Sequence, residues 1–400
     1  MKKVNLIAVM AILLVSITFL NIGCNNNRNN TDTNVETDAS GKDTMENKTQ
    51  GDDLEPMSDR PDWAPDMDKK MWLVIEKLQS YGAPAIETLT PQEARIQPSP
   101  TTAVMDLMTE KNIPMPTPTM MVDTMGKDIP VKGGMVHARI YTPRPMDNDD
   151  NDAANDTTGA MPVIVYYHGG GWVIADLNTY DASAKGLAEQ TGAIVVSVHY
   201  RQAPEFKFPT AHNDAFAAYQ WVLKNAASMK GDPKRVAVVG ESAGGNLAAN
   251  VSMMARDKKI MMPVHQVLVY PVASKDLNAE SVNKYANAKP LNKPMLEWFM
   301  KHYLPNMAAA SDPRIDLVSA NLKGLPSTTI IAAEIDPLYD GGKLLSDKLK
   351  EANVDVDYKD YNGVTHEFFG MATIVPNAKD AQAYVSKNLK KAFDKGMSIK

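Results

Sequence analysis

The sequence predicts an α/β protein in which a mostly parallel central sheet is flanked by helices on both faces. From residue 162 onward, short apolar runs of β type alternate with segments whose apolar residues recur at helical spacing. A glycine-flanked turn at 240–244 joins one such run directly to a helix-like segment. The chain of 400 residues is 44% hydrophobic, which is enough to bury a substantial core. No internal repeat is visible.

Helical signals precede the sheet. Apolar residues at helical spacing predict a helix over about 66–79. Thr90, Pro91 and Glu93 form an N-cap, a proline at the first helical position and a capping-box acid, so a second helix is expected there. The Pro- and Met-rich stretch 113–121 breaks regular structure. Its methionines are expected to fill gaps in the core, with an adaptable acyl pocket as the alternative.

The sheet is predicted from apolar runs that end at turns. The predicted strands are 135–142, 162–168, 193–199, 236–239, 266–270, 328–332 and 354–361. The predicted helices among them are 213–223, the segment after the 240–244 turn, 343–351 and 378–393. Residues 274–312 lack a strand pattern and include a helix with Leu296, Phe299 and Tyr303 on one face, so they are interpreted as an insertion.

The amino-terminal end predicts export. Two lysines precede an apolar run from about 6 to 20, which suits the core of a signal peptide and is short for a membrane span. The run leads into NIGC, which resembles the lipobox of bacterial lipoproteins, although Asn21 stands where that motif usually has Leu. The resemblance implies that 1–23 is a signal peptide and that Cys24 becomes a lipidated amino terminus. An ordinary cleaved signal is the alternative.

The next segment, 24–62, carries the lipidation site and a tether rich in Asn, Asp, Thr and Lys. Such a segment buries too little apolar surface to repay the entropy of ordering. It is interpreted as a flexible spacer between a membrane and the folded domain, 63–400. Cys24 is the single cysteine, so no intrachain disulfide and no thiolate metal cluster can form.

Charge and composition argue against two kinds of ligand. A formal net charge of -6 gives no electrostatic reason to bind nucleic acid. The acidic loop 147–160 resembles a calcium loop only in part, because Asp152 stands where Gly is needed and Thr158 where Glu is needed. This loop is interpreted as a solvated surface insertion. We therefore expect no metal and no other cofactor.

The turn at 240–244, GESAG, has the features of a nucleophile elbow. It follows an apolar strand and opens a helix, so Ser242 is expected on a strained turn clear of its neighbours. Gly240 and Gly244 allow the strand and the helix to approach closely. Ser242 is therefore the candidate nucleophile. Taken alone, the motif also fits an ordinary glycine-rich turn.

A second glycine-rich loop, HGGGW, begins at His168, directly after a predicted strand. Consecutive glycines suit a loop whose N–H groups turn toward a ligand oxygen. Gly169 and Gly170, together with Ala243 after the nucleophile, are therefore the candidate donors of an oxyanion hole. His168 and Gly171 are expected to support this loop.

The base of such a site must be a histidine, because a serine alkoxide needs a proton acceptor with a pKa near the working pH. Among the seven histidines, His366 stands out because its loop directly follows a strand and precedes the last predicted helix. Asp336, just past the strand 328–332, is the candidate acid that orients it, with Asp340 as the alternative. The order Ser242, Asp336, His366 is that of α/β-hydrolases.

Together these motifs resemble the hormone-sensitive-lipase-like (family IV) esterases of the α/β-hydrolase superfamily, over about 71–393. The chain also carries YRQAPE, which is similar to the family's YRLAPE and ends at the supporting residue Glu205. It departs from the family pattern with Gln202 for the usual Leu, Glu241 for the commoner Asp, and Glu367 where Gly usually follows the histidine. The last change is expected to alter the rim of the site or the pKa of the neighbouring histidine.

The resemblance implies an α/β-hydrolase fold with a helical cap, from about 63–125 and 274–312, over the site. It also implies a serine carboxylesterase that cleaves esters of short to medium acyl chains through an acyl-enzyme. The alternatives are deacetylation or amide hydrolysis by the same groups, or a non-catalytic ligand-binding relative. The expected partners are a small-molecule ester and, through Cys24, the membrane of a bacterial envelope on its periplasmic or surface side. The oligomeric state is left open, a homo-oligomer included.

Overall fold

The computed structural model describes residues 54–146 and 159–398. The predicted signal peptide, Cys24 and most of the tether lie outside the described residues, as does most of the loop 147–160. Within the described ranges, no helix combines the length and apolar character needed to cross a membrane.

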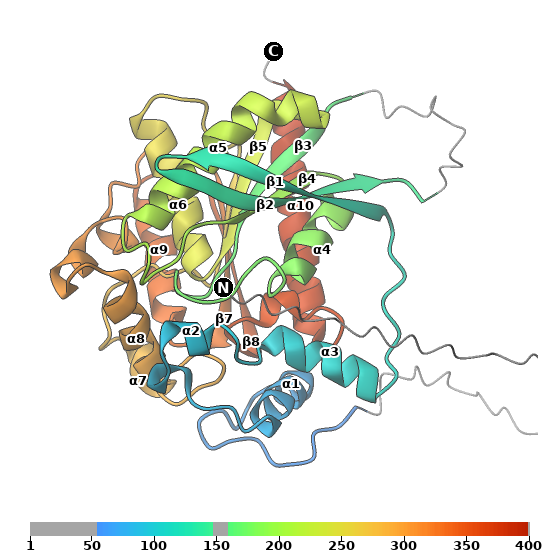
Figure 1. Ribbon diagram of the computed structural model, residues 1–400, viewed down its shortest axis with the longest axis vertical. Coiled ribbons are helices and arrows are strands. Elements are labelled where there is room, and N and C mark those ends of the chain that lie inside the picture. Colours follow the sequence, from blue (N-terminus) through green and yellow to red (C-terminus); the bar gives the residue numbers. More distant parts are fainter. Residues whose placement is uncertain (1–53, 147–158, 399–400) are drawn as a thin grey trace, which may run out of the picture. The chain divides into compact units, whose positions relative to one another are not determined.

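The described residues form an eight-stranded sheet in the order β1-β2-β4-β3-β5-β6-β7-β8 (Figure 1). β2 pairs antiparallel with β1 and β4, whereas all the other neighbours run parallel, which confirms the predicted mostly parallel sheet. The strands are β1 (Met121–Val131), β2 (Gly134–Arg144), β3 (Met161–Tyr167), β4 (Ile194–His199), β5 (Gly231–Glu241), β6 (Gln266–Val269), β7 (Thr328–Ile335) and β8 (Val356–Thr365).

Helices cover both faces of the sheet, because each central strand is apolar on both sides. Val163 and Val165 of β3 lie in one core cluster, whereas Ile164 and Tyr166 between and after them lie in the other. α5, α6 and α9 contribute to the first cluster, and α4 and α10 pack together over the second (Figure 1). These helices are α4 (Asp181–Thr191), α5 (Thr210–Asn225), α6 (Ala243–Asp257), α9 (Tyr339–Glu351) and α10 (Pro376–Ser398).

Two groups of short helices, far apart in the sequence, gather in the lower part of Figure 1. Hydrogen bonds join them, from Trp298 Nε1 to the Leu89 carbonyl at 3.1 Å and from Asn292 Nδ2 to Glu87 Oε1 at 3.3 Å. The α-helices are α1 (Lys69–Ser80), α2 (Pro91–Ala94), α3 (Pro100–Glu110), α7 (Glu280–Lys284) and α8 (Lys293–Tyr303). The 3₁₀ turns among the described residues are η1 (Ile86–Thr88), η2 (Ala226–Met229), η3 (Met307–Ser311), η4 (Leu317–Ser319) and η5 (Phe368–Gly370).

Four strands and α-helices, β1, α3, α4 and the five-residue α7, were not predicted from the sequence. β1 is an edge strand with mostly exposed residues, so no apolar alternation marks it. α4 buries mainly small residues around Leu187, which gives a weak helical pattern. β1 begins at Met121, inside the segment that was expected to form the cap up to about residue 125. That segment therefore enters the sheet earlier than expected. By contrast, the capping box of Thr90 and Glu93 is confirmed.

Candidate active site

Ser242 lies on the strained turn that the sequence predicts, between β5 and α6. Its backbone has φ 56° and ψ -117°, a region that residues with a side chain rarely adopt. The turn is possible because the flanking glycines have no side chain. A Cβ atom at Gly240 would lie 2.0 Å from the Gly244 carbonyl oxygen, and one at Gly244 would lie 1.9 Å from the carbonyl oxygen of Tyr167. Larger residues at either position would push the helix off the strand.

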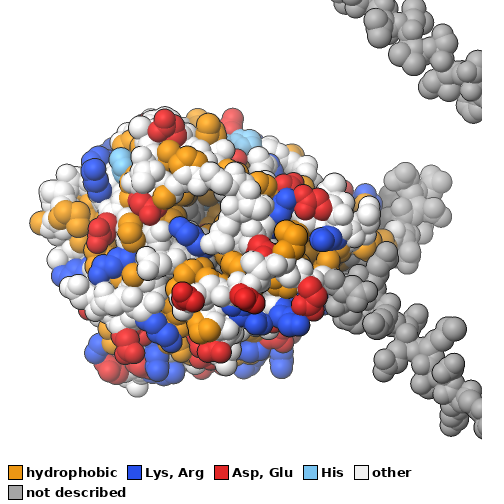
Figure 2. Space-filling model, turned by 90° about the horizontal axis from the view of Figure 1, so that it is seen from below, with side chains coloured by type: hydrophobic (Ala, Val, Ile, Leu, Met, Phe, Trp, Pro, Cys, Tyr) orange, Lys and Arg blue, Asp and Glu red, His pale blue; other side chains and the backbone are white. Residues whose placement is uncertain are grey.

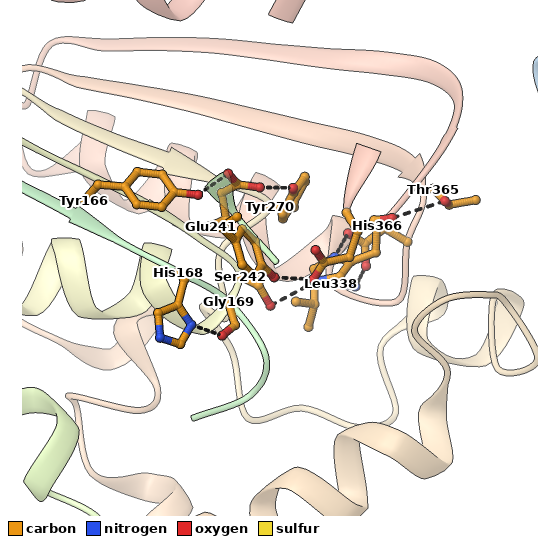
Figure 3. Close-up of polar contacts among 12 residues, drawn as sticks. Tyr166, His168, Gly169, Glu241, Ser242, Tyr270, Leu338, Thr365 and His366 are labelled. Atoms are coloured by element: carbon orange, nitrogen blue, oxygen red, sulfur yellow. Dashed lines mark hydrogen bonds and ion pairs between the residues drawn. The ribbon is translucent and has the colours of Figure 1, made fainter. Parts of the chain in front are cut away.

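The structure brings Ser242, His366 and Asp336 together in one chain of hydrogen bonds. Figure 3 shows Ser242 and His366 side by side. His366 Nε2 lies 2.9 Å from Ser242 Oγ, and Nδ1 lies 2.6 Å from Asp336 Oδ2. The other carboxylate oxygen of Asp336 accepts the backbone N–H of Leu338 at 2.8 Å, which fixes the carboxylate plane. All three side chains are buried. They come from the ends of β5, β7 and β8, which lie at one edge of the parallel sheet.

Asp340, the alternative acid, does not reach the histidine. Its Oδ2 instead accepts the backbone N–H of Ser281 at 2.8 Å and ties the start of α9 to α7. Of the two candidate acids, only Asp336 contacts His366.

Charges around His366 favour its protonated form. Burial alone would lower the pKa of the imidazole, but Asp336 and, more weakly, Glu367 and Glu241 outweigh burial and raise the pKa above the ordinary histidine value. A base with a raised pKa takes a proton from a serine more readily. The ring also packs against Tyr270, with 4.6 Å between the centroids.

The predicted oxyanion loop is held from behind by aromatic and polar contacts. His168 donates through Nδ1 to the Gly169 carbonyl at 2.9 Å and stacks on Tyr200, with 4.4 Å between the ring centroids. The Tyr200 hydroxyl donates to the carbonyl oxygens of His168 and Gly169. Burial and the neighbouring His199 lower the pKa of His168 to about 3, so this ring is neutral at physiological pH. Gly170 takes φ 90° and Gly171 φ 57°, which turns the loop sharply.

The YRQAPE segment also supports this loop. Gln202, one of the departures from the family pattern, donates through Nε2 to the carbonyl oxygens of Ile174 and Ala175 at 2.7 and 2.9 Å. Glu205 forms an ion pair with Arg95, with 2.7 Å between the charged atoms, and this guanidinium lowers the carboxyl pKa to about 2. A leucine in place of Gln202 would leave both carbonyl oxygens without this donor.

The other two departures are Glu241, which places a buried carboxyl group behind the histidine, and Glu367, which places a partly buried one beside it. Glu241 accepts hydrogen bonds from the hydroxyls of Tyr166 and Tyr270 (Figure 3). Burial, followed by repulsion from Glu367, raises its pKa to about 7. Glu367 accepts a hydrogen bond from the Tyr180 hydroxyl at 2.5 Å, and burial raises its pKa despite the nearby histidine.

A pocket of about 290 Å³ opens onto Ser242 and His366. The floor of this pocket consists of Gly170, Gly171, Tyr180, Ser242, His366 and Glu367. Its roof consists of lining residues within 78–100 and 289–299, from the two groups of short helices. Phe299 of the roof lies directly against Gly171 of the floor. Among the described residues, no group of three or more His, Cys, Asp or Glu side chains is arranged to hold a metal ion.

Sequence reasoning missed Tyr180 and Arg95, two residues that hold segments around the site in place. Tyr180 contacts both Gly169 and Glu367, although it lies in a turn with no recognisable motif. Arg95 follows a short helix and reaches the Val173 carbonyl at 2.9 Å. No local pattern marks either residue, because the hydrogen bonds from Arg95 to Val173 and from Tyr180 to Glu367 join segments more than 70 positions apart. Only a three-dimensional pairing of segments identifies them.

Comparison with known proteins agrees with the fold described above. Residues 164–370 match the family described by the alpha/beta hydrolase fold, over half of the chain. The chain belongs to the hormone-sensitive-lipase-like (family IV) esterases of that fold. These enzymes are carboxylic ester hydrolases.

Two relatives and one solved structure illustrate the membership. Carboxylesterase NlhH of Mycobacterium tuberculosis is 38% identical over 237 residues, which cover 58% of this chain and 74% of that protein. Ethyl acetate hydrolase of Pseudomonas putida is 35% identical over 260 residues, covering 64% and 79% respectively. The esterase of Pyrobaculum calidifontis is 33% identical, with a TM-score of 0.67 over 76% of this chain and 94% of that one.

Proposed function

We propose that this carboxylic ester hydrolase cleaves esters of short to medium acyl chains by a two-step acyl-enzyme mechanism. The observation that carries the proposal is the continuous hydrogen-bonded chain from Asp336 through His366 to Ser242. A serine becomes a nucleophile when a neighbouring base takes its proton, and an oriented carboxylate keeps that base in the correct tautomer.

In the first step, Ser242 Oγ attacks the ester carbonyl carbon while its proton passes to His366 Nε2. The imidazolium that forms is stabilised by Asp336. The carbonyl oxygen becomes an oxyanion, for which the N–H groups of Gly169, Gly170 and Ala243 are the proposed donors. When the tetrahedral intermediate collapses, the bond to the alcohol oxygen breaks and that oxygen takes the proton from Nε2.

The second step releases the acid. Water attacks the acyl carbon, its proton passes to His366 Nε2, and Ser242 Oγ leaves with that proton as the acid departs. The modest volume of the pocket and the presence of Leu291, Met295 and Phe299 in its roof support a short to medium acyl chain. The ester named for the Pseudomonas putida relative, ethyl acetate, is also small.

The test is turnover of p-nitrophenyl butyrate by the full chain, purified in a mild detergent that contains no ester bond. We expect a burst of nitrophenol, because acylation releases the alcohol before water completes the cycle. Ser242→Ala should lose the burst and at least about 10⁴-fold in kcat. The matched control is Ser228→Ala, which removes an exposed serine hydroxyl and should leave kcat unchanged.

Equal activity of Ser242→Ala and the parent would refute the proposal. Faster turnover of the butyryl anilide would make the enzyme an amidase instead.

We also propose that the chain is exported and held at a bacterial envelope membrane by a lipid on Cys24. The support is the apolar leader, the lipobox-like NIGC and the polar stretch that follows. The predicted cap, formed by the roof segments, would then face substrates outside the cytoplasm. Labelled palmitate should enter the wild-type chain in cells. Incorporation that persists at the same level in Cys24→Ala would exclude lipidation at this residue.

A further inference from the structure

Glu367 lies at the pocket surface in a conformation that favours glycine. Its backbone φ is 70°, in the left-handed region, so a glutamate here is held against a local preference. One carboxylate oxygen, Oε1, accepts the Tyr180 hydroxyl at 2.5 Å. Within the described residues no hydrogen bond reaches Oε2, and the side chain, 19% exposed, lines the pocket. A carboxylate oxygen is therefore free to accept a hydrogen bond from a bound molecule.

The position of this carboxylate relates it to the alcohol half of the ester. Glu367 Oε1 lies 3.9 Å from His366 Nε2, the atom that returns a proton to the leaving oxygen. The leaving oxygen must come within hydrogen-bond distance of Nε2 at that moment. The carboxylate consequently lies beside the alcohol part of the substrate, within reach of a group one or two carbons from the leaving oxygen.

The charges around the pocket favour a neutral hydrogen-bond donor over an ion. Lys289 and Glu87 line the same pocket, so a cationic or an anionic leaving group would meet a like charge. On the face seen in Figure 2, acidic and basic side chains are interspersed, so this face presents no field of one sign. A hydroxyl can donate to a carboxylate and accept from an ammonium group, so it suits both.

We propose that Glu367 is a specificity-determining residue whose carboxylate accepts a hydrogen bond from a hydroxyl on the alcohol part of the substrate. The enzyme would then favour esters of diols and polyols over esters of simple alkanols. This inference rests on the proposed function, because it assigns the leaving group to the side of the pocket where His366 donates its proton.

The experiment compares esters that share the butyryl group and differ in one atom or group of the alcohol. They are 2-hydroxyethyl butyrate, 2-methoxyethyl butyrate, which can accept but not donate, and butyrylcholine, which carries a positive charge. Released acid is titrated, and kcat/KM is measured for the full chain. We expect the hydroxyethyl ester to be preferred to the methoxyethyl ester by about tenfold or more, because hydrogen bonds to charged groups are among the stronger ones.

Two variants test the residue. In Glu367→Gln the amide oxygen can keep the bond from Tyr180, which leaves an NH₂ donor where Oε2 was, so the preference should fall to about one. Glu367→Gly suits the backbone conformation, removes the carboxylate and should lose the preference too. The Glu367→Gly variant keeps the test available if Glu367→Gln does not fold. Labelling of Ser242 by a fluorophosphonate gives the active fraction of each sample.

The outcomes separate the specificity from the chemistry. If the parent enzyme showed no preference for 2-hydroxyethyl butyrate over 2-methoxyethyl butyrate, the inference would be overturned. It would also be overturned if the variants lost kcat/KM equally on both esters, because a purely structural role of Glu367 predicts that result. A dominant activity on butyrylcholine that depends on Glu367 would also overturn it, because the recognised group would be a cation. Absence of any Ser242-dependent turnover would refute the proposed function itself.

Discussion

The floor and the roof of the pocket are built in different ways. Most floor residues lie within a few residues of strand ends, and hydrogen bonds hold their side chains, as with His366, which bonds to both Ser242 and Asp336. The roof joins segments about 200 positions apart through apolar contacts and a few bonds such as Trp298 to Leu89. The chemistry is therefore set by a rigid local frame, whereas substrate choice depends on how two distant segments pack.

If the floor is as rigid as its hydrogen bonds indicate, the largest loss of activity should come from changing Asp336, the acid that holds His366 from behind the floor. Asp336→Asn should lower kcat by about 10³- to 10⁴-fold, because an amide stabilises the wrong tautomer and does not balance the imidazolium. The matched control is Asp340→Asn, which weakens only the contact to Ser281 and should cost less than about tenfold. The measurement is steady-state kcat on p-nitrophenyl butyrate for both variants, and thermal unfolding checks that each variant is folded. The reverse ranking would show that Asp340 supplies the acid.

This difference also explains what the sequence could predict. Ser242, Asp336 and His366 each follow a predicted strand, and parallel strands bring their carboxyl ends to one edge, so their meeting was predictable. The contact of Tyr180 with Glu367 was not, since 187 positions separate the two residues and no motif includes the tyrosine. The roof was expected only as a cap, without its depth or lining, because the packing of η1 against α8 decides both.

Substitutions in the roof should change which acyl chains the enzyme prefers, and should change the rate of the chemical steps much less. Phe299→Leu shortens the side chain that lies on Gly171, which gives the acyl chain more room. We expect kcat/KM for the octanoate ester to rise severalfold relative to the butyrate ester, mainly through KM, with kcat changed less than about threefold. The control is Phe206→Leu, which alters an exposed ring outside the pocket. A uniform fall in kcat for both esters would mean that the roof also holds the catalytic geometry.

The smallest expected effect concerns two neighbouring residues of the floor, Glu367 and His366. The base must be neutral to act, so kcat/KM should be full above the raised pKa of His366 and fall as the pH drops through it. Glu367→Gln removes a negative charge that helps to raise this pKa, so the acid limb of the profile should move to lower pH.

The profile is measured from about pH 5 to about pH 9 with p-nitrophenyl butyrate, whose alcohol has no donor, so that leaving-group recognition does not interfere. Glu205→Gln is the matched control. Its carboxylate is already paired with Arg95, and removing it should leave the acid limb where it is. If both variants moved the limb equally, the overall charge of the protein would set the pKa of His366. If the limb moved to higher pH in Glu367→Gln, the negative charge of Glu367 would not be what raises the pKa of His366, and this electrostatic account would be refuted.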